Sequence, residues 1–187
     1  NISISISLFQ KERNNVKINF NELLIKKASY LQAKESYDEA NEIYDNILIN
    51  NSHHDKALTN KALILINSKQ YNDAIKLLEK SIKSKPNILK NYLHLSSVLS
   101  KIEDYDKALD ILNDSEKLDN NSSLIKSEKG YVLTKLNLYD KAEEILLNAI
   151  KIDPKNQSAY SNMASIFIEK NQINNALTWL EKAIYIK

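Results

Sequence analysis

The chain of 187 residues contains 26 basic and 24 acidic side chains, which give a formal net charge of +2 at pH 7. Such a balance gives no strong electrostatic attraction to nucleic acid or to a membrane surface. The absence of cysteine excludes disulfides and thiol chemistry, and a single glycine excludes a glycine-rich phosphate-binding loop.

Residues 1–20 are expected to form a tail or linker. Residues 1–9 alternate apolar and polar side chains, and three interpretations remain open: a tail ordered by contacts, an extra helix covering the first repeat, or the end of a longer apolar anchor. Alone, the stretch is shorter than the ~20 residues that a membrane span needs. Because the first residue is Asn rather than Met, we interpret the chain as a fragment or a processed protein. The expected location is the cytoplasm, with a membrane-anchored protein as the alternative.

From residue 21 onward, one motif recurs at a fixed period. Tyr-Asp-Lys-Ala occupies residues 139–142 and 105–108, with related copies at residues 71–74, 37–40 and, in weakened form, 173–176. The closing alanines stand at 40, 74, 108, 142 and 176, so successive copies are 34 residues apart. A fixed period of this length is typical of a solenoid. We therefore predict five repeats within 21–187, namely 21–54, 55–88, 89–122, 123–156 and 157–187.

Each repeat is predicted to contain two helices, A and B. The first half has apolar residues at helical spacing, as in Tyr92, Leu95 and Leu99, and the second half has its own stripe, as in Ile145 and Leu146. Position 18 of each repeat is Asp or Asn, which we expect to be the N-cap of helix B. These expected caps are Asp38, Asn72, Asp106, Asp140 and Asn174.

Two positions of the repeat are always small. Position 20 is Ala in all five repeats, and the side chain at position 8 is no larger than that of Ser. The residues at position 8 are Ala28, Ala62, Ser96, Gly130 and Ala164. Small side chains allow two helices to approach to ~8–10 Å, and larger ones would cost roughly 1–3 kcal/mol through overpacking. We expect these positions to be buried where helices A and B cross.

These features resemble the tetratricopeptide repeat family. The matching features are the period, the small residue at position 8, Tyr at 17, Ala at 20, and proline at 32, where Pro86 and Pro154 stand. Ser81 and Ser115 depart from the usual Ala at position 27. The resemblance covers 21–187 and implies an all-α, right-handed superhelical solenoid.

The sequence shows no constellation of catalytic or metal-ligating residues. His53 and His54 stand in the connection between repeats 1 and 2, and a metal would need further ligands at fixed geometry. His94 has no Ser, Cys or Asp partner at helical spacing. We therefore predict a chain that is not an enzyme and needs no cofactor or metal.

The resemblance also implies a concave groove lined by positions 2, 5, 6, 9, 12 and 13 of the A helices. Lys56 and Asn60 are four residues apart, as are Lys90 and His94, so each pair shares one face of its helix. Asn can match a peptide unit and Lys can pair with a carboxylate. The predicted peptide-binding residues are Lys56, Asn60, Leu63, Lys90, Leu93, His94 and Tyr131. The alternative interpretation is that all of them are solvated helix surface.

The expected partner is therefore an extended or helical segment of another protein, with an acidic segment or a chain-terminal carboxylate suiting the lysines. Chaperone-binding members of the family hold a terminal carboxylate with a defined Lys and Asn pattern. Asn60 and Lys90 match that pattern, but Ile25 and Ser29 break its first pair. A looser groove that tolerates anions is the remaining expectation.

The last repeat ends in an apolar helix without a polar capping helix after it. Solenoids usually end in such a cap, so the surface of Leu177, Trp179, Leu180 and Tyr185 is expected to stay exposed, to contact another copy, or to contact missing sequence.

The favoured function is a non-catalytic interaction scaffold. The alternatives are a regulatory or substrate-recruiting arm of a larger enzyme, and a structural unit that self-associates through the last helix. Nucleic acid is not an expected partner, because a single Arg and a net charge of +2 offer few phosphate contacts. A membrane is an expected partner only if a missing N-terminal anchor exists.

Overall fold

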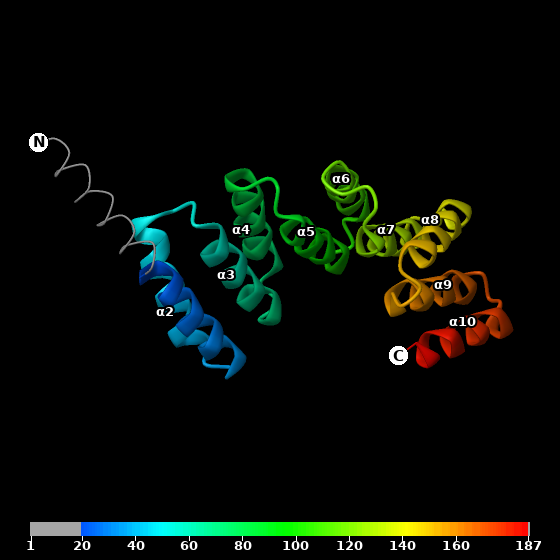
Figure 1. Ribbon diagram of the computed structural model, residues 1–187, viewed down its shortest axis with the longest axis horizontal. Coiled ribbons are helices and arrows are strands. Elements are labelled where there is room, and N and C mark those ends of the chain that lie inside the picture. Colours follow the sequence, from blue (N-terminus) through cyan, green and yellow to red (C-terminus); the bar gives the residue numbers. More distant parts are fainter. Residues whose placement is uncertain (1–19, 187) are drawn as a thin grey trace, which may run out of the picture. The chain divides into compact units, whose positions relative to one another are not determined.

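The computed structural model describes residues 20–186, and the regular structure within them is helical (Figure 1). The A helices are the 20–33 helix, α3 (Asp55–Asn67), α5 (Leu89–Lys101), α7 (Ser123–Lys135) and α9 (Gln157–Glu169). The B helices are α2 (Tyr37–Asn50), α4 (Tyr71–Ser84), α6 (Tyr105–Glu116), α8 (Tyr139–Ile152) and α10 (Ile173–Tyr185). This all-α arrangement of helix pairs confirms the predicted fold class. The predicted tail lies, apart from Phe20, outside the described residues.

The chain divides into two compact units, Asn1–Lys85 and Pro86–Lys187. The described part of the first unit contains the 20–33 helix and α2 to α4, and the second unit contains α5 to α10. Within each unit, an A helix and the following B helix lie side by side, as α9 and α10 do in Figure 1. Among the described helices, none is both long and apolar enough to cross a membrane.

The core of each unit is built from the same repeat positions. In the first unit, Ala28 and Ala40 are buried between the 20–33 helix and α2. In the second unit, Ala142, Leu146 and Met163 are buried among α7, α8 and α9. Positions 8 and 20 are buried in every repeat, as the pattern of small residues predicts.

Gly130 shows why position 8 must stay small. A Cβ atom placed on Gly130 would lie 2.4 Å from Cγ of Leu146, a side chain that is itself fully buried. Because such a contact cannot exist unless the Leu146 side chain or its helix moves, the close approach of α7 and α8 at this point depends on the missing side chain.

The turn between helices A and B differs from its prediction. Each described B helix begins at position 17, so the N-cap is position 16, and the residue at position 18 lies in the first turn of the helix. The prediction that position 18 caps helix B is therefore wrong. The residues it named were Asp38, Asn72, Asp106, Asp140 and Asn174. At position 18 these side chains lie near the positive end of the dipole of helix B. That position stabilises the negative charge of the three aspartates.

The physical reason is a left-handed residue at position 15 of every repeat. These residues are Glu35, Lys69, Glu103, Asn137 and Asn171, with φ between 56° and 63°. The amide after each of them donates to a carbonyl five residues earlier, as from Gln70 to Leu65 at 2.8 Å. This Schellman closure ends helix A and leaves the next helix to begin two residues after the left-handed one.

Candidate functional site

The structure places the sequence-predicted site residues on three A helices in two units. In the first unit α3 carries Lys56, Asn60 and Leu63, and in the second unit α5 carries Lys90, Leu93 and His94 while α7 carries Tyr131. Each unit therefore holds its own share of the predicted residues.

In the first unit, the predicted polar residues contact the preceding A helix. Lys56 Nζ lies 2.8 Å from both carboxylate oxygens of Glu22, and Asn60 Nδ2 donates to Ser29 Oγ at 3.2 Å. The hydrogen bond from Lys56 holds the pKa of Glu22 below its ordinary value. An acidic ligand would therefore compete with Glu22 for the charge of Lys56.

In the second unit, three successive A helices line a cavity of about 380 Å³. The lining is mainly hydroxyl and amide groups, together with one cationic, one acidic and one aromatic side chain. The lining residues are Ser97, Ser100 and Lys101 of α5, Glu128 and Tyr131 of α7, and Gln157, Ser158, Ser161 and Asn162 of α9. Of the sequence-predicted residues, Tyr131 is the one that lines this cavity.

Glu128 is the acidic side chain of the cavity. It is half-buried, and burial raises the pKa of its carboxyl. Within residues 20–186 no hydrogen bond or ion pair to this carboxyl is found, whereas the neighbouring amide of Asn162 donates to the backbone carbonyl of Ser127 at 2.9 Å. A carboxyl in this state is ready to accept a hydrogen bond from a ligand N–H or to pair with a cation.

Tyr131 lines the same cavity. Lys135 Nζ lies 6.0 Å from the centre of the Tyr131 ring and 2.8 Å from a carboxylate oxygen of Glu169. The hydrogen bond to Glu169 raises the pKa of Lys135. The ring therefore has a fixed cation nearby, at the distance of a cation–π contact.

His94 has an unused hydrogen-bonding atom on α5. Its Nε2 is buried without a hydrogen-bond partner in the described chain. Burial lowers the pKa of the ring, and the positive charge of Lys90 lowers it further. The imidazole is therefore neutral at pH 7, and Nε2 can donate or accept according to its tautomer.

The sequence placed Glu128 and Asn162 at groove-facing position 6, but the predicted site did not include them. The signal that could have identified these two residues is their position in the repeat. The burial of a carboxyl by residues from two other helices cannot be read from that position. His54, in the connection between repeats 1 and 2, caps α3 by accepting a hydrogen bond from the amide of Ala57.

Comparisons with models of known protein families identify the family to which this chain belongs. A family model described as "Anaphase-promoting complex, cyclosome, subunit 3" matches residues 33–115 and again residues 67–149. The two matches are displaced by one repeat of 34 residues, so the model recognises the repeated unit rather than one fixed stretch. A tetratricopeptide repeat model matches residues 157–187. The chain belongs to the tetratricopeptide repeat family, which is generally a non-catalytic interaction fold.

Several solved structures share this fold. YrrB, described as a TPR protein with an unusual peptide-binding site, is 24% identical over 88% of this chain and 84% of its own, with a TM-score of 0.68. TTC0263 from Thermus thermophilus is 21% identical over 89% and 91%, with a TM-score of 0.73. MamA from Desulfovibrio magneticus is 18% identical over 89% and 94%, with a TM-score of 0.74. No curated protein matches the sequence.

Proposed function

We propose that this chain is a protein-interaction scaffold that binds a peptide segment of a partner along its A helices. The observation that carries the proposal is the cavity of α5, α7 and α9, with the unpaired carboxyl of Glu128 in its wall. The same fold in YrrB, a protein described as having a peptide-binding site, supports the proposal.

The chemistry of the cavity suits an extended main chain. A peptide in extended form offers a donor and an acceptor at each residue, every ~3.3 Å. Serine hydroxyls such as those of Ser97 and Ser158 can hydrogen-bond to both the N–H donor and the C=O acceptor of a peptide. The ring of Tyr131 adds an apolar surface to the same lining. The lining is therefore suited to hold a peptide backbone without demanding one sequence.

Charged groups then set the preference for ligand side chains. Glu128 would pair with a basic side chain, whereas Lys101, in the same cavity, would pair with an acidic one. Within the first unit taken by itself, Lys56 and Asn60 would give the acidic preference expected from the sequence, once an incoming carboxylate has displaced Glu22 from Lys56. On α5, Lys90, Leu93 and His94 complete the proposed set.

The proposal is tested with peptides selected by display on the immobilised chain and then titrated by calorimetry. Glu128→Gln should weaken binding about tenfold or more, because a hydrogen bond to a charged group contributes roughly 1.5–3 kcal/mol. Tyr131→Ala should weaken it as well. Glu144→Gln, an exposed substitution on α8, is the matched control and should bind like the wild type. Wild-type affinity in Glu128→Gln, Tyr131→Ala and Lys90→Ala together would exclude the A helices as the binding surface.

A further inference from the structure

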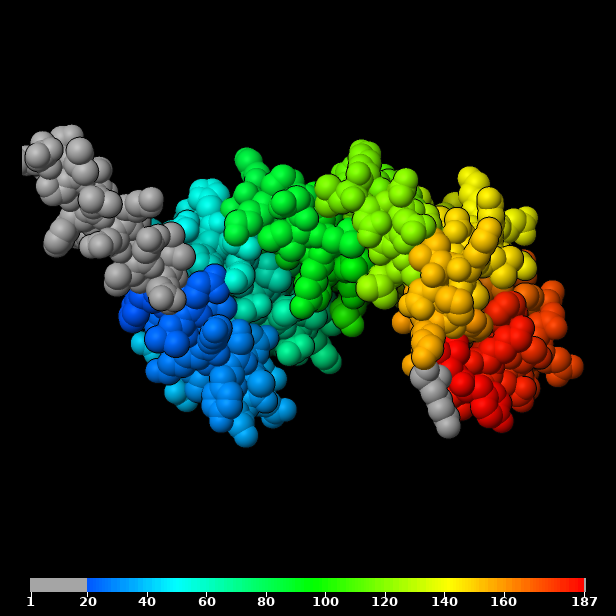
Figure 2. Space-filling view, in the orientation of Figure 1, coloured from blue at the N-terminus to red at the C-terminus, as the bar shows by residue number. Residues whose placement is uncertain are grey.

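Among residues 20–186, two helix faces that are covered elsewhere in the repeats are exposed. One belongs to the 20–33 helix of the first unit and the other to α10 of the second unit. Figure 2 shows each helix at a surface of its own unit, the 20–33 helix in blue and α10 in red. These two faces are called the A face and the B face below.

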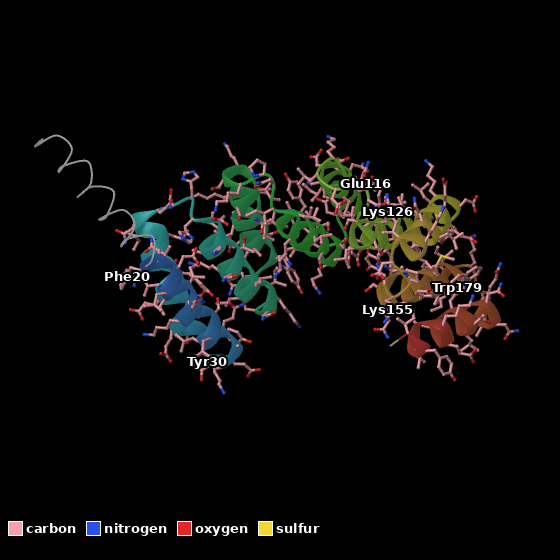
Figure 3. The ribbon with its side chains drawn as sticks, viewed as in Figure 1. Phe20, Tyr30, Glu116, Lys126, Lys155 and Trp179 are labelled. Carbon is pink, nitrogen blue, oxygen red and sulfur yellow. The ribbon has the colours of Figure 1, made fainter. Side chains whose placement is uncertain are left out.

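The A face is formed by Leu23 and Tyr30, at positions 3 and 10 of the repeat, and Phe20 precedes Leu23 by three residues. Figure 3 shows Phe20 and Tyr30 toward opposite ends of this helix. Leu23 is 63% exposed and Tyr30 is 64% exposed. At the same positions of α9, Ala159 and Ile166 are 0% exposed, because they pack against α8 in the core of the second unit. Positions 3 and 10 are thus the surface by which an A helix contacts the B helix of the preceding repeat.

Another A helix shows the same arrangement. Ala57 and Ile64 of α3 are buried together with Tyr44 and Ile47 of α2 in the core of the first unit. The role of positions 3 and 10 therefore holds in both units. In the described chain, the 20–33 helix is the A helix whose residues at these positions remain exposed.

The B face is formed by Leu177, Leu180 and Ile184 of α10. Leu180, at position 24, is 37% exposed and Ile184 is 73% exposed. Leu146, at position 24 of α8, is 0% exposed and belongs to the buried cluster that α8 shares with α9. The contact of Tyr160 with Trp179, with ring centres 6.0 Å apart, covers a different side of α10 and leaves the B face open. The B face is therefore an apolar surface shaped to receive an A helix.

Charge gives a second, independent match between the two faces. In the first unit, Lys61 at position 7 of α3 pairs with Asp45 at position 25 of α2. Position 7 of the 20–33 helix is Lys27 and position 25 of α10 is Glu181, and both are exposed. A contact in the same register would therefore bring Lys27 to Glu181, as an intramolecular contact already brings Lys61 to Asp45.

We propose that a second copy of the chain occupies the B face, with the 20–33 helix of one copy packed on α10 of the next. The contact reproduces, between chains, the packing of an A helix on a B helix that each unit uses internally. Because the two faces are different surfaces, the contact is head-to-tail, and it continues into rings or open chains. This self-association does not involve the proposed peptide groove.

The test is the molar mass of the purified chain across a concentration series, measured by light scattering and sedimentation. The wild type should grow beyond a dimer as concentration rises. Tyr30→Glu and Leu180→Glu should each weaken association by about 30-fold or more, the effect of losing a central interface residue. Mixing the two variants should give a heterodimer and nothing larger, because one intact A face meets one intact B face.

Ile49→Glu is the matched control, because Ile49 is an exposed apolar residue of α2 outside both faces. It should assemble like the wild type, and circular dichroism should show the same helicity in every variant. A monomeric wild type would overturn the proposal and assign both faces to other occupants. The proposal would also be overturned if Tyr30→Glu assembled like the wild type, because α10 would then pair with α10 of another copy. It would be overturned as well if the mixture of the two variants showed no association.

A charge exchange tests the register of the contact without touching its apolar residues. Lys27→Glu should weaken association by roughly two- to fivefold, the range of an exposed ion pair. Adding Glu181→Lys to the same chain should restore it, since the lysine and the glutamate have then changed places. If the double variant associated no more tightly than Lys27→Glu alone, that result would contradict this register.

Discussion

The side-chain amide of Asn156 donates to both the backbone carbonyl and the hydroxyl of Ser123, at 3.1 and 2.7 Å, and both residues are buried. The Ser123 hydroxyl in turn donates to the carbonyl of Ala149 at 2.9 Å. Asn156 Oδ1 accepts a hydrogen bond from the amide of Ala159. One side chain therefore caps α9 and ties it to the first residue of α7.

Asn156→Ala is expected to lower the free energy of unfolding by about 2–4 kcal/mol. The lost cap costs about 1 kcal/mol, and the loss of the two buried hydrogen bonds to Ser123 adds roughly 1–3 kcal/mol. Asn156→Asp keeps the capping oxygen but turns a buried carboxylate oxygen toward the Ser123 carbonyl, so it should lose stability as well. Urea unfolding followed by circular dichroism gives both values. A stability for Asn156→Ala equal to that of the wild type would contradict this account.

Two glutamates of the second unit have carboxyls shifted in opposite directions. Burial acts to raise the pKa of Glu116, but Lys129 at 2.6 Å and Lys126 at 3.3 Å outweigh it, and the pKa lies below its ordinary value. Figure 3 shows Glu116 and Lys126 close together in the second unit. For Glu128, burial raises the pKa and no cation opposes it.

The two glutamine variants should therefore respond to pH with opposite signs. A lowered pKa stabilises the fold above the unfolded-state pKa, so Glu116→Gln should lose about 1–2 kcal/mol at pH 7. The loss should fade as pH falls through the folded-state pKa of Glu116. A raised pKa destabilises the charged form, so Glu128→Gln should be more stable than the wild type at pH 7. That gain should vanish below the unfolded-state pKa, where both side chains are neutral.

Urea midpoints between pH 7 and about pH 3, which spans the ordinary range of glutamate titration, measure both effects. Exposed Asn148→Ala, which removes no titratable group, is the control and should show neither trend. Parallel pH curves for the Glu116 and Glu128 variants would contradict the opposite shifts.

Glu103→Gly is expected to stabilise the fold by about 0.5–1 kcal/mol. Glu103 has φ of 63°, a conformation that costs an L-residue roughly 1–2 kcal/mol, whereas glycine adopts it freely and loses part of this gain to chain entropy. Asn137→Gly, at the same position of the next repeat, should gain less because Asn tolerates the left-handed region. Thermal unfolding of the two variants ranks them. An equal or larger gain for Asn137→Gly would count against backbone strain as the cause.

Gly130→Ala is expected to destabilise the second unit by about 1–3 kcal/mol. A new methyl group would overlap the buried side chain of Leu146, and this overpacking outweighs the gain of about 1 kcal/mol from the better helix former. Leu146→Ala alone should cost about 2–5 kcal/mol.

In the double variant the overlap is removed, so Gly130→Ala should become neutral or stabilising when Leu146 is already Ala. A double-mutant cycle from urea unfolding measures this coupling. If the losses of unfolding free energy in the two single variants were strictly additive, the contact between residues 130 and 146 would not be what limits the size of the side chain at position 8.

The repeat positions explain why much of the fold could be predicted. Periodicity alone places Leu112 and Leu146 at a position that the structure buries fully, and each A helix from α3 onward begins at the first residue of its predicted repeat. The turn could not be predicted in the same way, because glycine is the usual signal for a left-handed residue. Here Glu, Lys and Asn take that conformation, so no residue pattern indicated that helix B begins before position 18.

The candidate site was less predictable, for a physical reason. Helical spacing tells which side chains of one helix share a face, as Lys90 and His94 do. It does not tell how deeply neighbouring helices bury a carboxyl such as that of Glu128, nor that Lys56 already has Glu22 as a partner. Those properties depend on contacts between residues about one repeat apart in the chain.

The Schellman turn at position 15 has a consequence for how such a chain can change in length. Each turn takes its left-handed residue and its hydrogen bonds from its own repeat, as from Asp104 to Leu99 and from Leu138 to Leu133. Gain or loss of one whole unit of 34 residues therefore leaves every remaining turn with its own partners. An insertion of any other size inside a helix moves apolar residues off the buried stripe. Recombination between repeats is thus tolerated by this backbone, while small insertions within a helix are selected against.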